Sequence, residues 1–563
     1  MKLRHIKIEN FRGVTNFDLK LGDTTVLIGE NNSGKTAVLD ALRFALRDVR
    51  SRRGCAFDAY DFHLPNATAE PATASAISIR LTFREDVPGE WDDQQLARIN
   101  RANIAQIDAN GCASVILKVG ARYDVLTQDF VQDWEFQNLT GASLTNVSDT
   151  AMGMLQNEVS YYYLSALRDA AKHFDAKGTF WRPFLKESQL TPEKRTEIET
   201  KLAEVNELII SSHASFSQVV ARLKEVKDVV SIPGGGDLAS VDAVPGRLFD
   251  MLSKAQVSLN TGTGAKVPVG RHGEGTQSLA VLTLFNAFLQ AWSKGDPIVA
   301  MEEPEAHLHP SAVRALWQLI ERIPGQKIIS THSGDLLSEV PSDAVTRLHK
   351  VGGIVVAARL KDVNLDPNDT RKFNFHIRRA RGELLFAKGW ILGEGETEST
   401  LICECARLLS KDLERAGIRF VTYQTGISLE LCLRVANGMG IHWVVLADND
   451  IQGVKDHELV RNHLNGRLER DVLFVMPESN IEQHLCVNGF SDVYFNLLGA
   501  QPRHEVTAPP QDSKYPFQVA NALPRKLKTH AAQEVLAAIR NEGRPVPKLF
   551  QDVIVTALRL VEV

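Results

Sequence analysis

The feature that most constrains this chain is a glycine-rich loop at residues 29–36, Gly-Glu-Asn-Asn-Ser-Gly-Lys-Thr. An apolar run at 25–28 precedes it and a helix-forming run at 37–42 follows it, which is the strand–loop–helix context of a phosphate-binding loop. Its glycines let backbone N–H groups converge on a phosphate at the positive end of the helix dipole. We therefore expect a nucleotide-binding α/β domain. The expected nucleotide-binding residues of the loop are Gly29, Asn31, Asn32, Ser33, Gly34, Lys35 and Thr36.

Four side chains have specific expected roles at the triphosphate. Lys35 is expected to reach the β- and γ-phosphates, and Thr36 to offer its hydroxyl to magnesium. An apolar run at 297–301 leads directly into Glu302 and Glu303. We expect Glu302 to help hold the magnesium ion and Glu303 to polarise the attacking water.

Three further segments extend this region. An apolar run at 327–329 leads to His332, which in this order is expected to sense the γ-phosphate, although a lone histidine is more often structural. A glycine-rich turn at 270–278 opens an expected helix at 279–292. Residues 191–226 begin with Thr-Pro-Glu and carry apolar residues at three- and four-residue steps. This spacing predicts a helical arm that buries its apolar stripe against itself or a second subunit.

Length and composition limit the class of protein. A chain of 563 residues is too long for one core, so we expect at least two domains. With 44% hydrophobic residues, no long apolar run and no signal peptide at 1–8, it is expected to be cytoplasmic, with no membrane partner. The six scattered cysteines are expected to be reduced thiols. A net charge of −5 disfavours a general nucleic-acid coat. It still allows local contacts between nucleic acid and the basic stretches at 47–53 or 371–381. The alternative is that these stretches are ordinary solvated surface.

From about residue 386 strands and helices alternate again, which predicts a parallel sheet. Acidic residues follow three of its expected strands, and the carboxyl ends of parallel strands meet at one edge. Such oxygen ligands suit Mg²⁺ or Mn²⁺, and two ions can cleave a phosphodiester. Alternatively, each acid is an ordinary strand-end residue or helix N-cap. The acids are Glu394, Glu398, Asp448, Asp450 and Glu482.

The order of the N-terminal motifs resembles the ABC-type ATPases of the SMC/RecN/RecF kind, with residues 273–278 in the place of the signature turn. The resemblance implies that ATP binds between two heads, with Gly275 and Ser278 acting across the interface of a homodimer or higher homo-oligomer. The sequence departs from that family in three ways. Glu302 replaces an aspartate, the turn lacks the Leu-Ser-Gly-Gly-Gln form, and no glutamine loop is recognisable. These departures leave ATP hydrolysis open.

The acidic region resembles the TOPRIM domain, in which Glu394 would be the leading acid and Asp448 and Asp450 the metal pair. An ABC-type head followed by TOPRIM resembles the overcoming-lysogenization-defect (OLD) nuclease family, including the Gabija-type nuclease subunit. The resemblance implies an ATP-binding DNA endonuclease that uses Mg²⁺ or Mn²⁺ and serves in anti-phage defence. A helicase or another defence protein encoded nearby is the implied partner.

Two more roles follow only from the resemblance to the OLD family. Glu482 matches an additional metal-binding acid. A lysine near the C-terminus assists cleavage in that family, and the local pattern here favours Lys526 or Lys528 over Lys548.

The expected fold class is α/β, with an ABC-type ATPase head, an inserted helical dimerisation arm, a parallel-sheet TOPRIM domain and a small C-terminal helical extension. The expected bounds are 1–170 and 261–385 for the ATPase domain, 171–260 for the insertion, 386–500 for TOPRIM and 501–563 for the C-terminal part. An alternative function is a nucleotide-dependent switch or scaffold whose TOPRIM domain binds metal and partners without cleaving DNA. A topoisomerase or primase also uses TOPRIM, but the chain lacks zinc-binding cysteines and a recognisable tyrosine-bearing cleavage domain.

Overall fold

The computed structural model describes residues 1–49, 55–66, 68–165, 191–212, 258–260, 266–292, 295–379, 382–423 and 426–562. Several expected features lie outside these ranges: Arg50, Arg52, Arg53, Arg381 and the second half of the helical arm. The chain divides into two compact units. The first comprises Met1–Tyr163, Ile298–Glu303 and Gln326–Val563, and the second Leu164–Pro297 and Pro304–Gly325.

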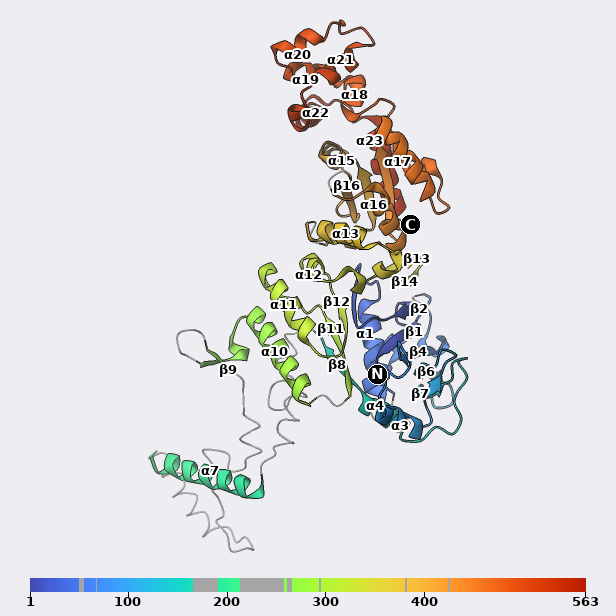
Figure 1. The fold of residues 1–563 in the computed structure, drawn as a ribbon, viewed down its shortest axis with the longest axis vertical. Helices are drawn as coiled ribbons and strands as arrows, with labels where there is room; N and C mark the ends of the chain where they lie inside the picture. The colour runs from blue at the N-terminus through green and yellow to red at the C-terminus, as the bar shows by residue number, and fades with distance from the viewer. Residues whose placement is uncertain are drawn as a thin grey trace. The chain divides into compact units, whose positions relative to one another are not determined.

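The first unit begins with a six-stranded sheet of order β2-β1-β4-β6-β5, in which β7 also pairs with β6 (Figure 1). Its pairs are antiparallel, and β4 alternates buried and half-buried residues as a sheet with one covered face does. Two short helices, α3 and α4, contact each other. The bounds are β1 Leu3–Phe11, β2 Val14–Lys20, β4 Ile77–Arg84, α3 Asp93–Arg101, β5 Gln106–Ile107, β6 Ala113–Asp124, β7 Asp129–Gln137 and α4 Ala151–Glu158.

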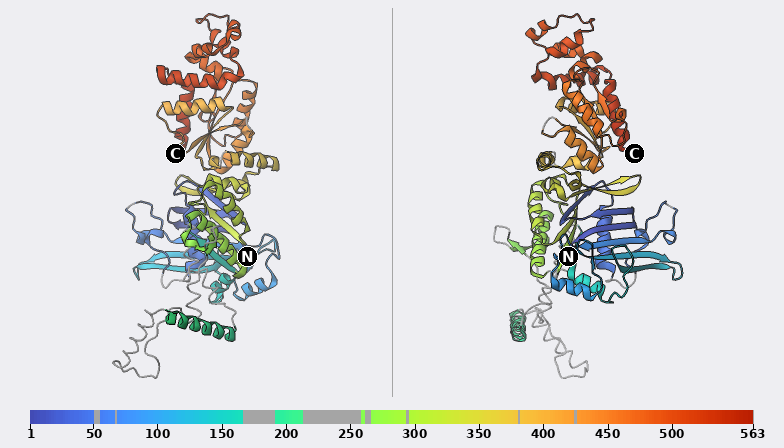
Figure 2. Two further views of the ribbon diagram at one scale, coloured as in Figure 1. Left: turned by 90° about the vertical axis from the view of Figure 1, so that its left-hand side faces the viewer. Right: turned by 45° about the vertical axis from the view of Figure 1, so that its right-hand side comes forward.

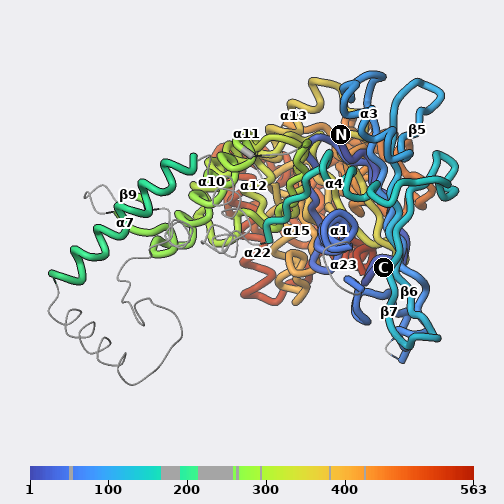
Figure 3. The backbone as a smooth tube through the Cα atoms, turned by 90° about the horizontal axis from the view of Figure 1, so that it is seen from below, coloured from blue at the N-terminus to red at the C-terminus, as the bar shows by residue number. Residues whose placement is uncertain are grey.

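A second sheet carries the phosphate loop and has the order β14-β13-β3-β12-β11-β8. Strands β11, β12, β3 and β13 pair in parallel, so the segments that follow them meet at one edge. Helix α1 begins at Lys35, so it includes the last two residues of the loop, and it is seen nearly end-on in Figure 3. The bounds are β3 Thr24–Gly29, α1 Lys35–Arg43, β8 Val159–Leu164, β11 Asp296–Glu302, β12 Gln326–Ser330, α12 Gly334–Glu339, β13 Val345–Val351, β14 Ile354–Arg359, α13 Pro367–Arg379 and α14 Glu383–Phe386.

The third sheet, β16-β15-β17-β18, is parallel throughout. The C-terminal helices return to it, because α22 packs on α15 and α23 contacts β15 and β17 (Figure 2). One apolar core therefore joins residues from Ile391 to Ala557. The bounds are β15 Gly389–Gly393, α15 Glu396–Leu408, β16 Ile418–Thr422, α16 Leu429–Met439, β17 His442–Ala447, α17 Ile451–Asn462, β18 Leu473–Val475, α18 Ile481–Leu485, α19 Ser491–Leu497, α20 Ala500–Glu505, α21 Tyr515–Ala522, α22 Lys528–Glu542 and α23 Lys548–Val561.

The described part of the second unit contains α7, Pro192–Ser212, which begins where the Thr-Pro-Glu signal predicts a helix. On its apolar stripe Leu202 is 8% exposed, whereas Val205 is 45% and Leu208 65% exposed. Burial of this stripe against a second subunit stays a prediction. The unit also contains the pair β9 Ser258–Asn260 and β10 Lys266–Pro268, and the helices α10 Glu274–Trp292 and α11 Pro310–Arg322, which contact each other.

The predicted fold class is confirmed: a phosphate-loop α/β sheet with an antiparallel partner precedes a separate parallel sheet and C-terminal helices. The predicted domain bounds stay predictions. All six cysteines are free thiols, and four of them are buried. No helix in the described ranges combines the length and apolar character needed to cross a bilayer.

Candidate functional site

The phosphate loop folds around the side chain of its own lysine, Lys35. The Lys35 ammonium donates to the carbonyl oxygens of Gly29 at 2.9 Å and Glu30 at 2.7 Å. Burial lowers its pKa to about 8. Gly29 has φ +145°, and a Cβ there would lie 2.2 Å from the Leu348 carbonyl oxygen, so only glycine fits. A bound phosphate would give this buried ammonium the counter-charge that backbone carbonyls do not provide.

Glu302 stands at the end of β11 with both carboxylate oxygens engaged. The Thr36 hydroxyl donates to its Oε1 at 2.6 Å, and the Tyr163 hydroxyl donates to its Oε2 at 2.7 Å. The structure therefore brings together the two residues predicted to hold the nucleotide-bound magnesium ion. Tyr163 was not predicted, and the only sequence signal for it is its position in the Tyr161–Tyr163 run of β8.

Glu303 and His332 also meet at this edge. Glu303 has φ +44°, and its Oε1 lies 3.7 Å from His332 Nε2. Burial and the positive charge of Lys35 lower the pKa of His332, so the ring is neutral at pH 7. A neutral imidazole beside a carboxylate can hydrogen-bond a water or a phosphate oxygen without adding charge.

The predicted signature turn lies in the second unit, at the start of α10. Glu274 Oε2 lies 3.3 Å from His307 Nδ1, and a Cβ on Gly275 would lie 3.3 Å from Leu308. The side chain of Ser278 is buried, at 2% exposure, while Thr276 is exposed. Contact between this turn and a nucleotide on a second copy stays a prediction, and in this conformation Ser278 is not available for it.

The five predicted TOPRIM acids surround the carboxyl edge of the third sheet. Asp448 directly follows β17, and burial is the largest cause that raises its pKa, to about 8. The negative charges of Glu398, Glu394, Glu482 and Asp450 raise it further, in that order. Burial also raises the pKa of Glu398, which is 6% exposed. The acids are therefore close enough to interact, and their mutual repulsion disfavours full ionisation without a cation.

The donor chemistry fits a divalent cation. Asp448 Oδ1 is a buried oxygen with no hydrogen-bond partner among the described residues, and carboxylate oxygens suit Mg²⁺ or Mn²⁺. The side chains do not form a complete metal site, because no three His, Cys, Asp or Glu side chains in the described ranges lie close enough together to bind one ion. Asp450 instead caps α17, accepting from the amides of Gln452 and Gly453 at 2.9 and 2.8 Å, as the N-cap alternative predicts. The metal ligands stay a prediction.

One of the candidate lysines reaches the acidic cluster. Lys528 Nζ lies 2.9 Å from Glu482 Oε1, and the Glu482 side chain is 5% exposed. Lys526 is exposed in the turn before α22. Lys548 pairs with Asp552 at 2.8 Å, one helical turn away. The structure therefore favours Lys528.

Two hydrogen-bonded networks support the cluster and were not predicted. The Tyr423 hydroxyl donates to Asp456 Oδ2 at 3.1 Å, and Gln452 donates to Asp456 Oδ1 at 3.0 Å. His484 Nδ1 lies 2.6 Å from Glu478 Oε2, which fixes the segment before Glu482. The four-residue spacing of Gln452 and Asp456 on α17 was an available signal, whereas the other contacts cross between elements.

Comparisons with known proteins add to this geometry. A family model described as "Protein of unknown function (DUF2813)" matches residues 1–231 and 244–383. A second model, "Overcoming lysogenization defect protein-like, TOPRIM domain", matches residues 385–450.

Three relatives match most of the chain. The uncharacterized protein YbjD of Escherichia coli (strain K12) is 28% identical over 88% of this chain and 89% of its own length. The endonuclease GajA of Bacillus cereus (strain VD045) is 26% identical over 81% of this chain and 76% of its own. The OLD nuclease of Thermus scotoductus (strain ATCC 700910 / SA-01) is 25% identical over 80% of this chain and 82% of its own length.

Proposed function

The chain belongs to the DUF2813 family and carries an OLD-like TOPRIM domain, and we propose that it is a metal-dependent DNA endonuclease. The observation that carries the proposal is the half-buried Asp448, whose buried Oδ1 has no hydrogen-bond partner among the described residues and which interacts with four other carboxyl groups. Two relatives that match most of the chain are named as nucleases. A divalent cation at this edge would relieve the repulsion among the acids and activate a water for attack on a DNA phosphodiester.

The phosphate loop is the regulatory half of the proposal. Lys35 and Thr36 would bind ATP with Mg²⁺, and Glu302 would share the ion with Thr36. Glu303 would orient the attacking water and His332 would contact the γ-phosphate. Gly275 would act from a second copy, which makes the working form at least a homodimer. The proposed role is anti-phage defence, together with a protein encoded nearby.

The direct test is conversion of supercoiled plasmid to nicked or linear DNA by the purified chain. Cleavage is expected with Mg²⁺ or Mn²⁺ and is expected to stop in EDTA, because the acids cannot cleave without a cation. ATP-driven dimerisation without cleavage under either metal would instead support the switch or scaffold function.

Replacing Lys528 by Met is expected to slow plasmid cleavage by about 10- to 100-fold, the usual cost of losing a partner of a metal-site carboxylate. The variant leaves Glu482 buried without its cation. Lys526→Met is expected to slow cleavage less, because its side chain points into solvent. The matched control is Lys514→Met, an exposed lysine of the same region. A larger loss in Lys526→Met than in Lys528→Met would reverse the assignment.

A further inference from the structure

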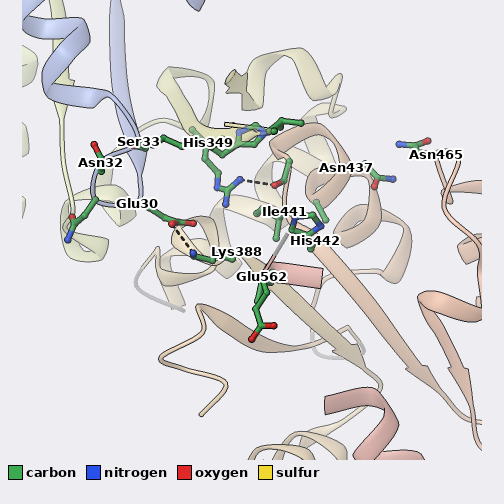
Figure 4. Close-up of a pocket in the computed structure, with 18 of the residues that line it drawn as sticks. Glu30, Asn32, Ser33, His349, Lys388, Asn437, Ile441, His442, Asn465 and Glu562 are labelled. Carbon is green, nitrogen blue, oxygen red and sulfur yellow. Dashed lines mark hydrogen bonds and ion pairs between the residues drawn. The ribbon is translucent and has the colours of Figure 1, made fainter. Parts of the chain in front are cut away.

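Within the first unit, a cavity of about 680 Å³ adjoins the outer side of the phosphate loop (Figure 4). Glu30–Ser33 line one side of it, and Lys388 and His442 line another. Lys388 precedes β15 and His442 begins β17, so this is the amino edge of the third sheet, opposite the acidic cluster. Lys35 and Thr36 do not line the cavity, whereas Asn31, Asn32 and Ser33 of the same loop do, so the cavity adjoins the expected triphosphate site and shares part of the loop with it. Its volume is typical of small-molecule sites, roughly 300–1,000 Å³.

Positive side chains outnumber negative ones on the cavity wall. Lys388 Nζ pairs with Glu30 Oε2 at 3.0 Å, so this lining carboxylate already has a partner. The guanidinium of Arg467 lies over the Trp443 ring, 4.1 Å from its centroid, and keeps its charge. Lys350 is exposed at the rim. The lining cations are Arg347, Lys350, Lys388 and Arg467, and the lining carboxylates are Glu30 and Glu562.

Arg347 is the most unusual of these cations, because it is 2% exposed. Its Nη1 donates to the carbonyl oxygens of Met439 at 2.9 Å and Gly440 at 2.8 Å, and its Nη2 donates to that of Ala387 at 3.0 Å. These contacts satisfy hydrogen bonds without supplying a negative charge. Its Nε has no hydrogen-bond partner among the described residues. Burial lowers its pKa to about 10 although the charge of Glu30 raises it, so a further anion nearby would stabilise this buried guanidinium.

The positive charges of these cations contribute to lowered pKa values of two histidines. Burial is the largest cause that lowers the pKa of His349, to about 4, and the charge of Arg347 lowers it further. Burial and the charges of Arg467 and Arg347 lower the pKa of His442. Both rings are therefore neutral near pH 7. His349 Nδ1 is buried and has no hydrogen-bond partner in the described ranges.

We propose that this cavity binds a small phosphate-bearing ligand of nucleotide size. The excess of lining cations matches the charge of a phosphate or pyrophosphate group. The amide side chains of Asn32 and Asn465 also line the cavity and can hydrogen-bond a sugar or a base, while Ile441 offers an apolar contact. The proposal goes beyond the nuclease function and does not require it, because the ligand site and the acidic cluster lie at opposite edges of one sheet.

The test is isothermal titration of inorganic pyrophosphate, and separately of AMP, into full-length Lys35→Ala protein, in which the phosphate loop has lost its phosphate-binding lysine. At least one of the two probes is expected to bind at a single site. The double variant Lys350→Glu/Lys388→Gln, added to Lys35→Ala, is expected to weaken that binding by about tenfold or more. Both side chains are partly or fully exposed, so the fold is expected to survive, and circular dichroism checks it.

The matched control is Lys372→Glu in the same Lys35→Ala background. Lys372 is an exposed lysine of α13 that does not line the cavity, and its replacement is expected to leave binding unchanged. No binding of either probe to Lys35→Ala protein would overturn the proposal. Equal binding of pyrophosphate and AMP by the double variant and by the control would also overturn it. So would a double variant that loses binding to duplex DNA but still binds pyrophosphate and AMP normally.

Discussion

Replacing Asp448 by Asn, or Glu398 by Gln, is expected to reduce plasmid cleavage on the order of 100-fold or more. Each change removes one negative carboxylate oxygen from the acidic cluster and keeps the shape of the side chain. Burial, and after it the charges of four neighbouring carboxyl groups, raise the pKa of Asp448, so a cation beside it would relieve an unfavourable negative charge. Among those neighbours, the charge of Glu398 raises the pKa of Asp448 most. The measurement is the initial rate of supercoiled-plasmid loss at saturating Mg²⁺ or Mn²⁺.

The matched control for this prediction is Glu396→Gln. Glu396 opens the same helix, α15, but its side chain is exposed and it is absent from the groups that perturb Asp448. The control is expected to cleave at the wild-type rate. Cleavage at the wild-type rate by Asp448→Asn protein would contradict the assignment of nuclease activity to this cluster. Equal losses of cleavage rate in Glu396→Gln and Glu398→Gln would show that only the total charge matters.

The sequence was sufficient where the signal is local. The loop at 29–36 fixes a strand before it and a helix after it, and the structure has β3 and α1 there. Acids that follow buried strands could be predicted to share an edge, because parallel strands end at the same side of a sheet. In the structure the charges of Glu398, Glu394, Glu482 and Asp450 all raise the pKa of Asp448, after burial, so these acids lie close enough to interact, while their role as metal ligands stays a prediction.

The sequence was insufficient where tertiary packing decides the contact. Lys526 and Lys528 are two residues apart, and only the tertiary placement of the start of α22 beside α18 brings Lys528 to Glu482. The contact of Tyr163 with Glu302 joins residues 139 positions apart, which no local pattern encodes. The surroundings of Arg347 depend in the same way on backbone carbonyls from α16 and from the residue before Lys388.

The free energy of unfolding of metal-free protein is expected to fall, relative to Asp448→Asn protein, as pH rises from about 4 to about 8. In the folded state the pKa of Asp448 is about 8, whereas an unperturbed aspartate has 3.8. Between these values the folded chain keeps the proton and the unfolded chain loses it, so ionisation favours unfolding. The slope is at most about 1.4 kcal/mol per pH unit. The amide of the Asp448→Asn variant cannot titrate, so comparing the two proteins isolates this group from all others.

Divalent cations are expected to reverse this loss, because they bind the ionised carboxylates of the folded state and replace the proton. Millimolar Mg²⁺ should therefore raise the thermal midpoint of the wild-type protein more at about pH 8 than at about pH 5, and should stabilise Asp448→Asn protein much less at either pH. The readout is thermal unfolding by circular dichroism with and without EDTA, which needs neither DNA nor ATP. Parallel pH profiles in the two proteins would mean that Asp448 is ionised without a cation, and equal stabilisation of both by Mg²⁺ would place the ion elsewhere in the chain.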